Sequence, residues 1–120
     1  MRKTILFIDD EVINLFVLKK RFETEYDVLT AESAEDALVK IEENKNVLDA
    51  IISDLRMPGM DGLQLIDKIK PELVDVPCFL LTGYELNEQI EGAISSKKIQ
   101  HMFKKPFDYN EIDSELKKMF

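Results

Sequence analysis

The 120-residue sequence has a single cysteine, no tryptophan, and no repeats, low-complexity tracts or Ser/Gly-rich linkers. One thiol, Cys78, cannot form an internal disulfide, and its apolar neighbours predict a buried, unreactive side chain. A chain without disulfides fits a reducing compartment, so we expect a cytoplasmic protein. The absence of linkers, together with the length, predicts one domain that spans residues 1–120.

Long apolar runs and an excess of basic residues are absent as well. The first apolar run stops at Asp9, which is too early for the core of a secretory signal, and no later run is long enough to span a membrane. The 16 lysines and arginines are outnumbered by 24 acidic residues, which gives a net charge of −8. A negative chain repels nucleic acid and anionic lipid, so we expect neither as a direct partner.

The sequence does contain a regular alternation of short apolar runs with amphipathic segments. The apolar runs predict strands at residues 4–8, 26–30, 48–53, 76–81 and 100–104. Apolar residues at helical spacing predict helices within residues 12–22, 34–41, 63–70, 86–94 and 112–119. Segment 12–22 is apolar on nearly all sides, so we expect it to lie deep against the sheet. The alternation predicts an α/β fold with three layers, a doubly wound, five-stranded parallel sheet of the flavodoxin-like type.

Carboxylates follow two of the predicted strands. Asp9 and Asp10 end the first strand, and Asp54 ends the third. The carboxyl ends of parallel strands meet at one edge of the sheet, where ligands bind, so these acids should share a crevice. Like charges in such a site destabilise it unless a cation neutralises them. All-oxygen ligands favour Mg²⁺, with Mn²⁺ as the alternative. The competing interpretation is that the acids are merely solvated or cap the next helix.

Two further side chains end strands at the same edge. Thr82 ends the fourth predicted strand and Lys105 the fifth. A hydroxyl and an ammonium group suit a phosphoryl group, and an Asp carboxylate can act as the nucleophile that forms an acyl phosphate. Asp54 is the candidate nucleophile. The three carboxylates and one lysine sum to −2, so a divalent cation would bring the pocket close to neutral before the phosphoryl group arrives.

Four motifs in this order resemble the receiver domain of response regulators, the phosphoacceptor module of two-component signalling. They are FIDDE at 7–11, DLRMPGMDG at 54–62, LLTG at 80–83 and KKPF at 104–107. The resemblance covers essentially the whole chain. It implies that Asp54 is phosphorylated, that Asp10 binds Mg²⁺ directly, that Asp9 holds it through water and that Arg56 contributes its backbone carbonyl. It also implies that Thr82 hydrogen-bonds the phosphoryl group and that Lys105, rather than the adjacent Lys104, pairs with it.

The resemblance implies further features of the chain. The Lys105–Pro106 bond should be cis, and the phosphodonor should be a histidine kinase or a histidine phosphotransfer protein. The output should pass through the surface of the fourth helix, fifth strand and fifth helix to an effector protein or a fused output domain, or to a phosphorylation-dependent homodimer.

Segment 86–94 has low intrinsic helicity, which fits either a movable output helix or a marginal surface helix. The family's usual aromatic switch residue is replaced by Met102, and Phe103 belongs to the opposite strand face.

Three other classes of protein fit the sequence less well than a phosphoacceptor domain does. An aspartyl-phosphate hydrolase usually has a second acid two residues after the nucleophile, where this chain has Arg56. A nucleotide binder needs a Ser, Thr or Gly loop after the first strand, where this chain has acids. A receiver-like interaction module would not need the intact acid set. We therefore expect phosphoryl acceptance and slow self-hydrolysis without turnover of a small molecule. We also expect Arg56 and Tyr84 to hinder attacking water, which dephosphorylation rates of Arg56→Asn and Tyr84→Ala would test.

Overall fold

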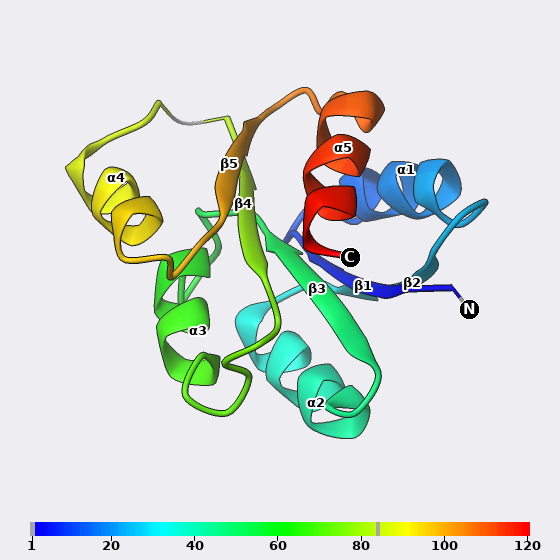
Figure 1. Cartoon of the computed structure of the whole chain (residues 1–120), viewed down its shortest axis with the longest axis horizontal. Helices are drawn as coiled ribbons and strands as arrows, with labels where there is room; N and C mark the ends of the chain where they lie inside the picture. Colours follow the sequence, from blue (N-terminus) through cyan, green and yellow to red (C-terminus); the bar gives the residue numbers. More distant parts are fainter. Residues whose placement is uncertain (1, 84) are drawn as a thin grey trace.

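The computed structural model describes residues 2–83 and 85–120, which form a three-layer α/β fold (Figure 1). The strands are β1 Thr4–Ile8, β2 Asp27–Ala31, β3 Leu48–Ser53, β4 Cys78–Thr82 and β5 His101–Lys104. The helices are α1 Val12–Phe22, α2 Ala34–Asn44, α3 Gly62–Ile69, α4 Glu88–Ser95 and α5 Tyr109–Met119. All neighbouring strands pair in parallel, in the order β2-β1-β3-β4-β5. The predicted fold class is confirmed, and strand boundaries differ from the predicted ones by two residues at most.

The core consists of two apolar clusters, one on each face of the sheet. Side chains alternate along β1, so Ile5 and Phe7 join the cluster beneath α1 and α5, whereas Leu6 and Ile8 join the cluster beneath α2, α3 and α4. Figure 1 shows the blue α1 and red α5 together on one side of the sheet and the other three helices on the opposite side. Burial on both faces explains why the central strands are continuous apolar runs rather than alternating ones.

Helix α1 differs from the prediction that it lies deep against the sheet. Only Leu15, Leu18 and Phe22 are buried on this helix. The outward side chains of Val12, Ile13, Phe16 and Val17 are 57, 76, 62 and 47% exposed. The prediction was wrong because a helix in a layer outside the sheet has only one face on the core, and the apolar residues on its other face are largely exposed. The pattern of apolar residues alone did not distinguish these two faces.

The sheet register sets the height of the acids. Ile8 pairs with Ser53 across β1 and β3, so the residues that follow, Asp9 and Asp54, leave the sheet at the same level. The Asp54 backbone N–H donates to the carbonyl of Ile8 at 2.8 Å, and the Asp9 N–H donates to the carbonyl of Ala31 at 3.1 Å. The chain runs outward from β1 to β2 and then returns across β1 to β3, so the acids lie at the point where the strand order reverses.

Helix starts near this edge are fixed by side-chain caps. Asp61 accepts a hydrogen bond from the backbone of Gln64, whose side chain in turn accepts one from the Asp61 N–H, a capping box at the start of α3. Asn87 caps α4 and Asp108 caps α5 in a similar way. Across residues 2–83 and 85–120, none of the helices combines the length and apolar content needed to cross a membrane.

Candidate functional site

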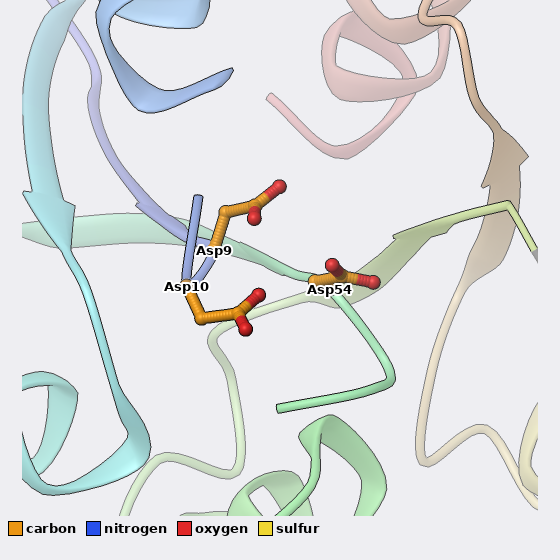
Figure 2. Close-up of side chains that lie close together, drawn as sticks. All are labelled: Asp9, Asp10 and Asp54. Carbon is orange, nitrogen blue, oxygen red and sulfur yellow. The ribbon is translucent and has the colours of Figure 1, made fainter. Parts of the chain in front are cut away.

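Three carboxylates converge at the carboxyl end of the sheet. One oxygen from each of Asp9, Asp10 and Asp54 lies within 4.8 Å of the others. Figure 2 shows Asp9 and Asp10 leaving the end of the blue β1 and Asp54 leaving the end of the green β3 beside them. Asp9 and Asp54 are buried, whereas Asp10 is exposed to solvent. The donor set is all oxygen and is open on one side, which fits the ligand preference of Mg²⁺, an ion that keeps several of its waters.

Lys105 lies between two of these acids. Its Nζ donates to Asp9 Oδ2 at 2.8 Å and to Asp54 Oδ2 at 3.0 Å. The backbone hydrogen bond from the Lys105 N–H to the carbonyl of Thr82, at 2.9 Å, holds Lys105 at this edge of the sheet. The Lys105–Pro106 peptide bond is cis, as the resemblance implied. The neighbouring Lys104 is exposed and pairs with Glu85 instead. The structure therefore brings the ammonium group of Lys105, and not that of Lys104, to the acid cluster.

The charges of the site shift the pKa of two groups in the same direction. Burial raises the pKa of Asp54, and the negative charge of Asp9 adds to this, while hydrogen bonding and attraction from Lys105 partly oppose it. Burial alone would lower the pKa of Lys105, but its hydrogen bonds to Asp9 and Asp54 outweigh burial and raise it. Lys105 therefore stays charged at neutral pH. Asp54 carries a less stabilised charge than an ordinary surface carboxylate.

Of the other predicted residues in the described part of the chain, Arg56 lines a cavity beside the acids, and Thr82 accepts a backbone hydrogen bond from Lys105. Thr82 is fully buried at the end of β4, and Arg56 is exposed two residues after Asp54. A cavity of about 340 Å³ is lined by Asp10, Glu11, Asp54, Arg56, Gly83 and Lys105. Tyr84, which we expected to limit access of water, lies outside the described residues.

Gly62 has a larger structural part than its loop position suggested. A Cβ built on this glycine would lie 2.2 Å from the backbone oxygen of Asp54, a contact that no side chain can make. The Gly62 N–H also donates to the carbonyl of Leu55 at 2.8 Å, and the Ser53 hydroxyl donates to the carbonyl of Asp54 at 2.8 Å. Gly62 therefore lets the start of α3 pack directly against the Asp54 backbone.

Sequence reasoning missed Asn14. Its side-chain Nδ2 donates to Asp9 Oδ2 and to Glu11 Oε1, each at 3.3 Å. Asn14 also lines a mostly apolar cleft of about 450 Å³ between α1 and the loop that contains Pro106 and Phe107. An asparagine in the first turn of a helix is common, so the sequence offered only its distance of five residues from Asp9 as a signal.

The two residues near the expected switch position face opposite sides of β5. Met102 packs against the cluster beneath α2, α3 and α4, whereas Phe103 is fully buried in the cluster beneath α1 and α5. Phe103 stacks on Phe79 with ring centroids 5.5 Å apart. Met102 is therefore the side chain on the α4 side of the strand.

Comparisons with known proteins agree with the fold. A family model described as "Response regulator receiver domain" matches residues 5–117. The two-component response regulator ARR10 of Arabidopsis thaliana is 36% identical over 101 residues, which make up 83% of this chain and 18% of that protein. The rice response regulator ORR21 is 32% identical over 101 residues, and this chain spans 14% of its length. The chain thus corresponds to less than a fifth of these relatives.

Solved structures give the same answer over nearly the whole chain. A response regulator receiver domain protein from Clostridium thermocellum has a TM-score of 0.87 and 28% identity, covering 98% of this chain and 93% of that one. The response regulator TrrA of Thermotoga maritima, solved in complex with Mg²⁺-BeF, has a TM-score of 0.82 and 32% identity, with 98% and 99% covered. The family match over residues 5–117 and these structures lead to one conclusion: the chain belongs to the response regulator receiver domain family.

Proposed function

We propose that this domain accepts a phosphoryl group from a partner's phosphohistidine onto Asp54, in a reaction that depends on Mg²⁺. The observation that carries the proposal is the cluster of Asp9, Asp10 and Asp54 with Lys105 hydrogen-bonded between two of them. Bound Mg²⁺ would neutralise negative charge on the acids and on the phosphoryl oxygens. Asp9, Asp10, Asp54 and the backbone carbonyl of Arg56 would hold the ion, and Mn²⁺ has the oxygen preference to replace it.

The proposed transfer needs one bond exchange. A carboxylate oxygen of Asp54 attacks phosphorus, the phosphorus–nitrogen bond of the phosphohistidine breaks, and the released imidazole nitrogen takes a proton from water. Lys105 turns toward the new phosphoryl oxygens, and the Thr82 hydroxyl donates a hydrogen bond to one of them. Asp54 acts as the nucleophile in its ionised form, which its position beside an ammonium group supports. Water later hydrolyses the acyl phosphate slowly, so no small metabolite is turned over.

The partners follow from this chemistry. The phosphodonor is a histidine kinase or a histidine phosphotransfer protein. The target of the signal is an effector protein, a fused output domain or a second phosphorylated copy of this domain. Signal output passes through the surface of α4, β5 and α5, where α4 buries only Ile90 and Ala93 and so has little to hold it in place. We place the protein in the cytoplasm, since a chain with one cysteine fits a reducing compartment. Burial raises the pKa of the Cys78 thiol to about 11, so this thiol is unreactive.

Mass spectrometry after incubation with Mg²⁺ and acetyl phosphate tests the proposal. Wild type should gain the mass of one phosphoryl group, and Asp54→Asn or excess chelator should abolish the gain. Asp75→Asn, which removes an exposed carboxylate away from the cluster, is the matched control and should be labelled as wild type is. An unlabelled wild type would support an interaction module that never carries phosphate, and label retained in Asp54→Asn would place the acceptor elsewhere.

A further inference from the structure

We propose that Asn14 is a positioning residue that holds the carboxylate of Asp9 once Lys105 has moved to the phosphoryl group. This inference rests on the proposed function, because it concerns the same site. It assigns a part to a side chain on α1 that is neither a metal ligand nor a partner of the phosphoryl group. The structure supports it through the hydrogen bonds of Asp9.

Asp9 is buried, with 2% of its surface exposed, so its two oxygens depend on donors from the protein. Oδ1 accepts from the backbone N–H of Glu11 at 2.9 Å. Oδ2 accepts from Lys105 Nζ at 2.8 Å and from Asn14 Nδ2 at 3.3 Å. The shorter contact at Oδ2 belongs to the lysine, and the longer one belongs to the asparagine. Asp9 is therefore held at Oδ2 by one mobile donor and one donor fixed to a helix.

Lys105 cannot keep its present contacts in the phosphorylated state. Its ammonium group now bridges Asp9 and Asp54 through single oxygens. A phosphoryl group on Asp54 adds three strong acceptor oxygens and negative charge in the same place, which attracts the ammonium group away from Asp9. Oδ2 of Asp9 would then retain Asn14 as its side-chain donor. Without Asn14, a buried oxygen would lose both side-chain donors in the state that must persist.

Asparagine suits this task because its amide carries no charge. The acid pocket sums to −2 with Lys105 included, and an amide donor leaves that sum unchanged. Asn14 Nδ2 also donates to Glu11 Oε1 at 3.3 Å, which orients the amide from the other side. Its backbone is fixed in the first turn of α1, where the Asn14 N–H donates to the carbonyl of Glu11 at 3.0 Å. A donor built on a helix keeps its position when the lysine leaves.

The test carries out two titrations on each of three proteins: wild type, Asn14→Leu and Val17→Ala. Amide chemical shifts measure binding in each titration. Leucine keeps the shape of asparagine and removes the donor. Val17 lines the same cleft, without a polar contact to Asp9, and serves as the matched control. One titration uses Mg²⁺ alone; the other adds beryllofluoride, a phosphoryl mimic, at saturating Mg²⁺. Loss of an outer hydrogen bond to a metal ligand typically weakens binding ~10-fold or more, and the long Asn14 contact falls at the low end.

For Asn14→Leu we expect beryllofluoride affinity to fall about 10-fold. Mg²⁺ affinity should fall less, because Lys105 still donates to Oδ2 of Asp9 when Mg²⁺ binds alone. The excess loss in the second titration is the signature of a donor needed after Lys105 moves. Val17→Ala should bind both as wild type does. Equal losses in both titrations, unchanged affinities, or the same losses in Val17→Ala would overturn the inference. If wild type itself binds neither Mg²⁺ nor beryllofluoride, the proposed function fails instead.

Discussion

Among single residues, Asp54, the proposed nucleophile, also lowers the stability of the folded domain. Its pKa is raised because burial and the charge of Asp9 outweigh the attraction of Lys105. A carboxyl whose pKa is raised by folding contributes its full stability only at low pH, where it is protonated in both states, and that stability is lost as pH rises through the folded-state pKa. At neutral pH the charged Asp54 is therefore a net burden on the folded state. This gives a prediction that needs no partner protein.

We expect Asp54→Asn to be more stable than wild type at pH 7.5, in chelator, by on the order of 1 kcal/mol, or about 3–6 °C in Tm. The gap should narrow as pH falls toward 4, because wild-type Asp54 then becomes neutral as well. Thermal unfolding across this pH range measures it, with Asp75→Asn as the control that should show no such gap. A less stable Asp54→Asn at pH 7.5 would mean that the ion pair with Lys105 outweighs burial.

At the level of elements, α1 connects the acid site to an exposed apolar face. Val12, Ile13, Phe16 and Val17 face outward directly after the acids that end β1. Lys20 lies over the Phe16 ring at 5.7 Å from its centroid, so a positive charge lies beside this apolar face. If Asp54 accepts a phosphoryl group as proposed, this apolar helix face beside the acids would suit a phosphodonor that presents an apolar helix face of its own.

We expect Phe16→Ala to reduce kcat/KM for transfer from a phosphorylated protein donor about 10-fold, the effect of losing ~1.4 kcal/mol at an aromatic anchor. Labelling by acetyl phosphate should not change, because Phe16 does not contact the acids. Val39→Ala, which truncates an exposed apolar side chain on α2, is the control and should transfer normally. If Phe16→Ala and wild type receive phosphate from the protein donor at equal rates, the donor docks elsewhere.

For the whole molecule, the sequence predicted the parts of the site that depend on strand ends. Asp9, Asp10, Asp54, Thr82 and Lys105 follow apolar runs, and the parallel sheet necessarily gathers such positions at one edge. Contacts that depend on how layers pack were not predictable in this way. The rotation of α1 decides that Asn14 contacts Asp9 and that Phe16 faces outward, and the close approach of α3 to β3 decides that residue 62 must be glycine.

If the acid pocket binds Mg²⁺ as proposed, the stability of the whole domain depends on the ion. Folding brings three carboxylates together against one ammonium group, and in the unfolded chain Asp54 is far along the sequence from Asp9 and Asp10. An ion that binds only the folded state stabilises it by RT ln(1 + [L]/Kd), or ~1.4 kcal/mol at a concentration about ten times Kd. Because Asp10 is exposed, replacing it disturbs packing little while removing one charge and one ligand oxygen.

We therefore expect Mg²⁺ to raise the Tm of wild type by about 3–6 °C over NaCl of equal ionic strength. Asp10→Asn should unfold at a slightly higher temperature than wild type without the ion, because it relieves repulsion, yet gain less than about 1 °C from Mg²⁺. Calorimetry of both proteins measures these changes: Asp10→Asn should have the higher Tm without Mg²⁺, and wild type should have the higher Tm with it. An equal rise in both would indicate general screening of the net charge of −8, and no rise in wild type would remove the metal from the proposed chemistry.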